Sequence, residues 1–128
     1  MNNYTLVRPE HLNHHGFLFG GMMLKWVDEF AWLAASKEFR GCKLVTVAMD
    51  EIRFTKQVPL GAILRFNIQF VRQGNTSVTY HVRVYSDEPG SETEKFVFAN
   101  SITFVRVSDE GMKLKLPQRQ EFIPCENF

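Results

Sequence analysis

The apolar side chains of this sequence change their period near residue 43, and this change limits the folds that the chain can adopt. Residues 20 to 39 carry apolar side chains three and four positions apart, which predicts one long amphipathic helix with Gly41 just beyond its end. From residue 43 onward the period is two, which predicts strands. One helix is then available for one face of an antiparallel sheet, and a sheet that curls around this helix buries both apolar surfaces.

The predicted strands are joined mostly by hairpins. The residues Gln73-Gly74-Asn75 form a tight turn between two segments that alternate apolar and polar side chains. The last segment is apolar on both sides, which favours a central strand. Strands are expected at residues 4–7, 44–54, 64–70, 78–84 and 95–107.

The composition indicates a folded protein without the charge that nucleic acid requires. Hydrophobic residues make up 45% of the 128 positions, which is enough for one domain. We place this domain at residues 1–116 and a C-terminal tail at residues 117–128. The 15 basic and 14 acidic side chains nearly cancel, so nothing points to nucleic acid. No apolar run reaches membrane-spanning length and no signal peptide opens the chain, so we expect a soluble cytoplasmic protein without a membrane partner.

The sequence contains no pattern for a metal site or a disulfide framework. Cys42 and Cys125 are far apart and lack metal-type spacing, which is typical of reduced thiols. His14 and His15 are adjacent in a predicted loop, and adjacent loop residues chelate a metal poorly without further ligands. We therefore expect no bound metal.

The residues of greatest chemical interest lie at the predicted start of the helix. Gly20 and Gly21 open the helix, where unpaired N–H groups and the helix dipole suit a phosphate or a developing oxyanion. Asp28 follows inside an otherwise apolar helix, where an acid costs stability unless it is paired or functional. Eight residues along one helix correspond to roughly 12 Å. One reacting carbon cannot touch both groups, so if Gly20 and Asp28 act together, Asp28 must come from a second chain, as in a two-fold dimer.

Several motifs together carry a resemblance to a known family. They are Asn13-x-x-Gly16-x-x-Phe19-Gly20-Gly21, Asp28-Glu29 on the predicted helix, and Val45-Thr46-Val47-Ala48-Met49-Asp50 on the next strand. This pattern resembles the hotdog-fold acyl-CoA thioesterases, in the acyl-CoA hydrolase branch, over about residues 8 to 116. The resemblance implies an α+β hotdog fold, in which a curled antiparallel sheet of five strands wraps around one long central helix.

The resemblance also implies roles for individual residues in acyl-CoA hydrolysis. The backbone N–H of Gly20 would be the oxyanion donor, and Asp28 of the partner subunit would be the general base or nucleophile. Asn13 would orient water or the thioester, and Thr46 would help to hold the water. The CoA tail would run along a hairpin and past the second glycine, which assigns CoA binding to Gly21, Arg72, Gly74, Asn75, Thr76 and Ser77. CoA belongs to the substrate, so no cofactor is expected, and the assembly would be a homodimer with shared sites or a trimer of such dimers.

Each of these assignments has a structural alternative. The glycine pair could simply permit close packing of the helix on the sheet, and Asn13 could be an ordinary turn residue. Thr46 is a common strand residue by type, and Asp28 could be an acid favoured by the helix dipole, although that effect fades after the first turn. Basic residues proposed to meet the CoA phosphates, which are Arg53, Lys56 and Arg72, could be solvated surface charges.

Two other functions remain open on the sequence alone. Related hydratases and dehydratases pair a histidine with an acid near the helix, whereas here Phe19 precedes Gly20, which favours hydrolysis. A non-catalytic acyl-CoA-binding protein would keep an apolar pocket without needing Asp28. The residues expected to contribute to such a pocket are Phe17, Met22, Met23, Trp26 and Phe30.

Overall fold

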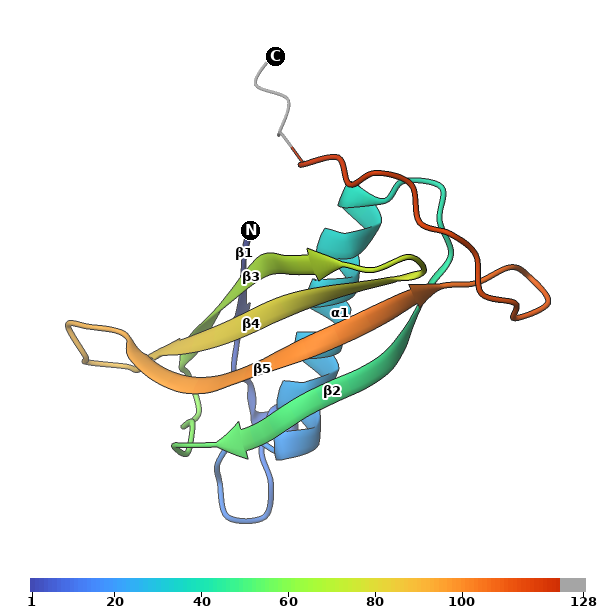
Figure 1. The fold of residues 1–128 in the computed structure, drawn as a ribbon. Coiled ribbons are helices and arrows are strands. Elements are labelled where there is room, and N and C mark those ends of the chain that lie inside the picture. The colour runs from blue at the N-terminus through green and yellow to red at the C-terminus, as the bar shows by residue number, and fades with distance from the viewer. Residues whose placement is uncertain (123–128) are drawn as a thin grey trace, which may run out of the picture.

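The computed structural model describes residues 1–122 and contains one antiparallel sheet curled against one long helix (Figure 1). The elements in chain order are β1 (Asn2–Leu6), a short 3-10 helix (Pro9–His11), α1 (Gly20–Glu38), β2 (Leu44–Phe54), β3 (Ile63–Gln73), β4 (Ser77–Asp87) and β5 (Lys95–Arg106). The strand order across the sheet is β1-β3-β4-β5-β2. The predicted helix and five strands are therefore confirmed, and β5 is an interior strand as its two apolar sides indicated.

The helix α1 lies on the concave face of the sheet because its apolar stripe meets the apolar alternation of the strands. Val27 and Ala31 are fully buried at the centre of that stripe. They belong to one core cluster with Phe66 and Phe98, which point inward from β3 and β5. Burying one large apolar side chain stabilises a fold by about 1.5–3 kcal/mol, so this helix–sheet contact holds the domain together.

The strand β2 is a long edge strand that a single chain leaves uncovered. It follows β5 at the end of the sheet, and nearly all of its eleven residues are exposed or half-exposed. Val47 and Phe54 are 54% and 52% exposed, respectively. The strand also contains two register shifts, and Glu51 at the second of them has a positive φ of 49°. A long apolar edge of this kind is a template for pairing with another strand.

The segment after β5 returns to the C-terminal end of α1. Glu38 is buried there and accepts hydrogen bonds from the Tyr80 hydroxyl (2.6 Å) and from Arg119 (2.6 Å). Burial, together with the neighbouring Glu38 carboxylate, raises the pKa of Tyr80 well above its ordinary value. The hydrogen bond to Glu38 likewise raises the pKa of Arg119. These contacts join residues 38, 80 and 119, so the described part of the C-terminal segment is bonded to the domain.

Two further observations concern membrane-spanning segments and cysteines. No helix within residues 1–122 combines the length and the apolar character that a membrane crossing requires. Cys42 makes no disulfide within the same residues, and Cys125 lies outside the described part of the chain.

Candidate functional site

The loop that leads into α1 is ordered by the side chain of Asn13. Its Oδ1 atom accepts hydrogen bonds from the backbone N–H groups of His15 (2.9 Å) and Phe17 (3.2 Å). The Asn13 N–H donates to the Phe17 carbonyl (2.7 Å), and Gly16 turns the loop with a φ of 83°. Asparagine suits such turns because its short amide can bond the backbone two residues ahead. Asn13 therefore shapes the approach to the helix start, and its proposed role toward substrate remains a prediction.

The first turn of α1 offers two free backbone N–H groups, which belong to Gly20 and Gly21. The N–H groups of Met22 and Met23 both donate to the Phe19 carbonyl, at 3.0 and 3.2 Å. The N–H groups of Gly20 and Gly21 precede these bonds, and within residues 1–122 neither donates to another backbone group. No side chain caps this helix end, and the first turn carries no acid. The helix start therefore presents positive partial charge, and its own first turn supplies no counterion.

A cavity of about 310 Å³ lies beside this helix start. Its polar lining includes Asn13 and Gly20, and most of its wall is apolar. The Phe54 ring lies 3.1 Å from the position that a Cβ atom at Gly20 would occupy. The other residues that line the cavity are Phe17, Leu18, Met23, Thr55, Lys56, Gln57, Val58 and Val97. The cavity thus combines the first residue of α1 and a few polar side chains with an apolar wall, which is a usual composition for a small-molecule pocket.

Asp28 lies in a different place, with Thr46. The Thr46 hydroxyl donates to Asp28 Oδ1 at 2.6 Å, across 18 residues of sequence. Lys25, Glu29 and Trp32 complete the lining of this shallow pocket of about 270 Å³. Neither Asp28 nor Thr46 lines the cavity at Gly20. A single chain therefore holds Gly20 and Asn13 beside one pocket and Asp28 and Thr46 beside another, with Gly20 and Asp28 about 12 Å apart along the helix.

The hairpin predicted to hold the CoA tail lies at the end of the sheet that contains Thr46. Ser77 pairs with Val105, and Val105 pairs with Val45, the neighbour of Thr46. The turn itself is held by the Gly74 N–H, which donates to the Ser77 carbonyl at 2.7 Å. The remaining hairpin residues assigned to CoA are Arg72, Asn75 and Thr76. All five hairpin residues are far from Gly20 in the sequence, and only Gly21, the sixth residue assigned to CoA, adjoins it.

Some residues singled out by sequence occupy the core instead of a pocket. Trp26 packs its ring against His11 and Phe66, and Phe30 packs against Phe66 with ring centroids 4.9 Å apart.

His14 stacks with its neighbour His15, with ring centroids 3.8 Å apart. Within residues 1–122, no three histidine, cysteine, aspartate or glutamate side chains come close enough together to hold a metal ion.

Among the lining residues that sequence reasoning missed, Phe54 touches the helix start from the end of β2. It was visible only as the last apolar residue of a predicted strand. Its neighbour in space, Gly20, lies 34 residues away in the chain, so no local pattern connects them.

An antiparallel sheet of five strands curled around one long helix is the hotdog fold. The chain belongs to the Thioesterase superfamily, whose sequence profile matches residues 15–93. The structure is similar to a hexameric hotdog fold thioesterase of Campylobacter jejuni, with a TM-score of 0.81, 27% identity, and coverage of 90% of this chain and 88% of that chain.

Two further proteins show the same likeness. Acyl-coenzyme A thioesterase 11 of Mus musculus is 36% identical over 113 residues, which cover 88% of this chain and 19% of the mouse protein. The chain thus spans about a fifth of that relative's length. An acyl-CoA hydrolase from Staphylococcus aureus, solved in complex with butyryl coenzyme A, matches with a TM-score of 0.78 and 28% identity, over 91% of this chain and 71% of that chain.

Proposed function

We propose that this chain hydrolyses acyl-CoA thioesters to a free acid and CoA, at sites shared between two copies of the chain. The observation that carries this proposal is the division of the site residues. Gly20 and Asn13 border one cavity, whereas Asp28 and Thr46 form a hydrogen-bonded pair elsewhere on the same chain. A second chain is the simplest source of the missing half of each site.

The exposed strand β2 supports the arrangement. Gly20 lies against Phe54 at the end of β2, while Asp28 is bonded to Thr46 near its beginning. If β2 pairs antiparallel with β2 of a second chain, the end of one strand lies beside the beginning of the other. This pairing would bring Asp28 of one copy toward Gly20 of the other, and the two-fold axis would generate two equal sites. The uncovered apolar side chains Val45, Val47, Ile52 and Phe54 would be buried in the process.

The chemistry follows from these groups. The thioester oxygen would accept a hydrogen bond from the Gly20 N–H, which stabilises the negative charge that develops when the carbonyl carbon is attacked. Asp28 would either take a proton from the attacking water or attack the carbonyl itself to give a mixed anhydride that water then cleaves. In both routes the carbon–sulfur bond breaks and the CoA sulfur leaves as a thiolate that acquires a proton. Thr46 would hold one Asp28 oxygen in place, so that the other faces the substrate.

The remaining features of the proposal follow the same site. The CoA tail would run along the hairpin from Arg72 to Ser77 and past Gly21. A thioester is already activated, so the reaction needs no cofactor. The relatives named as acyl-CoA thioesterases and hydrolases support the substrate class. We infer a cytoplasmic setting because two widely spaced cysteines are typical of a reducing compartment.

The test is release of free thiol from a panel of short-, medium- and long-chain acyl-CoAs by wild type and Asp28→Asn. Asparagine keeps the shape and the acceptor for Thr46 but lacks the carboxylate charge. We expect turnover by the wild type and a loss of about a hundredfold or more in kcat for the variant, in line with the usual contribution of a general base. Wild-type protein that binds acyl-CoA without releasing thiol would instead favour a binding protein, and water addition to an enoyl-CoA would favour a hydratase.

A further inference from the structure

A further cavity lies at the C-terminal end of α1, away from the candidate site. Its volume is about 860 Å³, which exceeds the volume of either pocket beside Gly20 or Asp28. It shares no lining residue with those two pockets. Its lining includes Glu38, which lies ten residues beyond Asp28, or about 15 Å along the helix. We call it the distal cavity.

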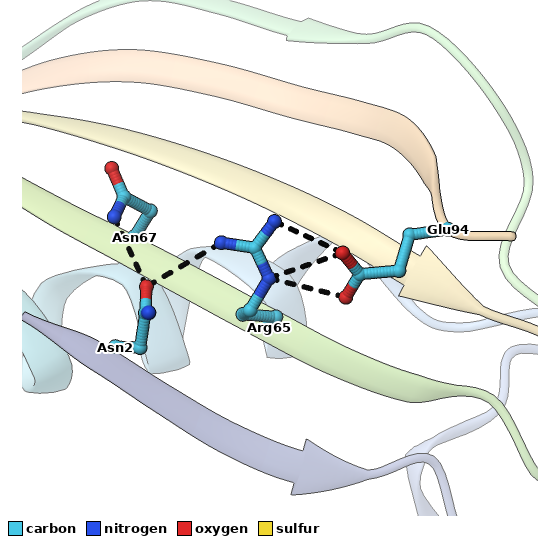
Figure 2. Close-up of polar contacts among 4 residues, drawn as sticks. All are labelled: Asn2, Arg65, Asn67 and Glu94. Atoms are coloured by element: carbon cyan, nitrogen blue, oxygen red, sulfur yellow. Dashed lines mark hydrogen bonds and ion pairs between the residues drawn. The ribbon is translucent and has the colours of Figure 1, made fainter.

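Three parts of the fold enclose the distal cavity. The strands β1 and β3 supply one wall, the last turns of α1 supply another, and residues 119–122 cross the end of the helix (Figure 1). A backbone N–H of this last segment donates to the Glu38 carbonyl at 3.1 Å. Figure 2 shows how β1 is fastened to β3, where Asn2 accepts hydrogen bonds from Asn67 (3.0 Å) and Arg65 (3.5 Å). Walls that are held in place beforehand lower the entropic cost of binding a ligand.

The larger part of the distal cavity's wall is apolar. Ala34 and Ile68 are buried core residues, and Leu33, Phe70 and Phe122 add larger side chains. A cavity of about 300–1,000 Å³ with such a wall is of the usual size for a small-molecule site. Each methylene group that a ligand buries there is expected to tighten binding about fourfold.

Two cationic side chains line the same cavity. The Arg119 guanidinium lies 4.3 Å from the centre of the Phe70 ring, and the Lys37 ammonium lies 5.4 Å from the centre of the Phe122 ring. Within residues 1–122, Arg119 donates one hydrogen bond, to Glu38 at 2.6 Å. A guanidinium has five N–H donors, and 28% of the Arg119 side chain is exposed. Arg119 therefore keeps donors for a further acceptor.

The buried acid of the distal cavity is already compensated. Tyr80 and Arg119 donate to the two oxygens of Glu38. Glu121 also lines the cavity, but it is exposed, so water screens its charge. Lys37 forms no ion pair with the described acids. The groups left for a ligand are therefore one cation and the remaining guanidinium donors.

We propose that the distal cavity binds an amphipathic carboxylic acid. Its carboxylate lies at Lys37 and Arg119, and its apolar chain lies against Leu33, Ile68 and Phe70. Charge-assisted hydrogen bonds from ammonium and guanidinium groups are the strong contacts for a carboxylate. An acid of this kind is also the product of the proposed hydrolysis, but the inference does not rest on that function, because the distal cavity is lined by other residues.

A phosphate group would meet the same two cations. It carries up to two negative charges, which would face one unpaired cation and lie near Glu38 and Glu121. A single carboxylate charge matches the single charge of Lys37, so the carboxylic acid is the better complement.

The test is isothermal titration of the full chain with decanoate, below the concentration at which decanoate forms micelles. Hexanoate and decanol are the comparison ligands, because the first has a shorter chain and the second lacks the carboxylate. We expect one decanoate per chain, and dissociation constants at least about tenfold higher for both comparison ligands.

Lys37→Glu tests where the acid binds. Lys37 is exposed in the last turn of α1, so the new acid can be solvated without unfolding the helix. We expect this reversal of charge to raise the dissociation constant of decanoate about tenfold or more. Lys25→Glu is the matched control, because it makes the same change at an exposed position of the same helix, beside Asp28. We expect it to bind as the wild type does, and circular dichroism verifies that both variants are folded.

Several results would overturn the proposal. They are the absence of saturable binding by the wild type, equal affinities of wild type and Lys37→Glu, and equal affinities for decanoate and decanol. Binding that is weakened by Lys25→Glu and not by Lys37→Glu would place the acid at the Asp28 pocket instead. The titration measures heat of binding, so its outcome is independent of whether the chain hydrolyses acyl-CoA.

Discussion

The hydrogen bond between Thr46 and Asp28 joins two candidate site residues directly through their side chains. At 2.6 Å it fixes one carboxylate oxygen, Oδ1, and no residue of the described chain donates to the other. An acid that acts on water needs one oxygen held and one free. In the proposed mechanism, the bond would give Thr46 a positioning role through Asp28.

Removal of the Thr46 hydroxyl tests this role. Thr46→Val keeps the shape of the side chain but cannot donate, whereas Thr46→Ser keeps the donor and serves as the control. Hydrogen bonds to charged groups contribute about 1.5–3 kcal/mol, so we expect Thr46→Val to lower kcat about tenfold to a hundredfold with little change in KM. Steady-state thiol release measures both constants. A valine variant with the kcat of the serine variant would contradict the role.

Gly20 allows the proposed oxyanion donor to be removed by substitution. It is the first residue of α1, a position where proline is well tolerated, and Phe19 before it is extended with a ψ of 130°. Gly20→Pro removes the N–H, while Gly20→Ala adds a side chain and keeps the N–H. We expect Gly20→Pro to lose a further factor of about 10²–10³ in kcat relative to Gly20→Ala, which is the usual cost of one oxyanion donor.

In Gly20→Ala, the new Cβ atom would crowd the Phe54 ring, which lies 3.1 Å from its position. That ring is half exposed and can move, so Gly20→Ala is expected to fold. Circular dichroism and unfolding midpoints of both variants check this. Equal rates for Gly20→Ala and Gly20→Pro would show that the Gly20 N–H is not the donor.

The secondary-structure elements could be predicted largely from sequence. Apolar spacing located α1 and the alternation of polar and apolar residues located β3 and β4, because these signals are local. The two register shifts in β2 could not be predicted, since they depend on its pairing with β5 and leave no mark in the sequence. The positive φ of Glu51, at the second shift, is equally hidden because glycine would be the expected residue there.

The candidate site could likewise be predicted from the sequence only in part. The spacing of Gly20 and Asp28 showed that one chain cannot bring the two groups together, because the rise of a helix is known. The Asp28–Thr46 bond and the contact of Phe54 with Gly20 join residues 18 and 34 positions apart, and they exist only once the sheet has formed. Long-range contacts of this kind are properties of the packed elements.

At the C-terminal end of α1, the Glu38 cluster makes stability depend on pH. The native state keeps the proton on Tyr80 at a pH where the unfolded chain releases it, because burial raises the pKa of Tyr80. The stability from this group is therefore present in full below about pH 10, the ordinary tyrosine pKa, and falls as pH rises above it.

Tyr80→Phe is expected to lower the unfolding free energy by about 1.5–3 kcal/mol at neutral pH, because Glu38 loses a buried donor. The difference between wild type and variant should shrink above pH 10, by up to about 1.4 kcal/mol per pH unit. Urea unfolding at fixed protein concentration between pH 7 and 11 measures it. Tyr4→Phe, at an exposed position, is the control for the loss of a tyrosine hydroxyl elsewhere on the sheet. A Tyr80→Phe difference that stays constant across this range would refute the linkage.

At the scale of the whole molecule, a shared site makes activity a property of the pair. Each site would need the helix start of one chain and Asp28 of the other. A chain damaged at Gly20 and a chain damaged at Asp28 would then be inactive alone, yet a mixed pair would contain one site with both groups intact.

Mixing Gly20→Pro with Asp28→Asn tests this directly. Equal amounts, unfolded together and refolded, give mixed pairs in half of the dimers, so about a quarter of the wild-type thiol release should return. Val47→Asp in both chains is the control, because a charge on the edge of β2 should prevent pairing and abolish the rescue. If each chain instead carried a complete site, mixing would restore nothing.

The same edge strand has a consequence for the chain before it meets a partner. Residues 44–49 contain no charge, proline or glycine and are rich in β-branched residues, which is the composition of segments that stack into amyloid-like aggregates. Lys43 precedes this segment and Asp50 and Glu51 follow it, in the flanking positions where charges slow such stacking. In a newly made chain, two kinds of pairing at β2 therefore compete. Pairing with one partner ends the growth of the sheet, whereas stacking of further copies extends it without limit.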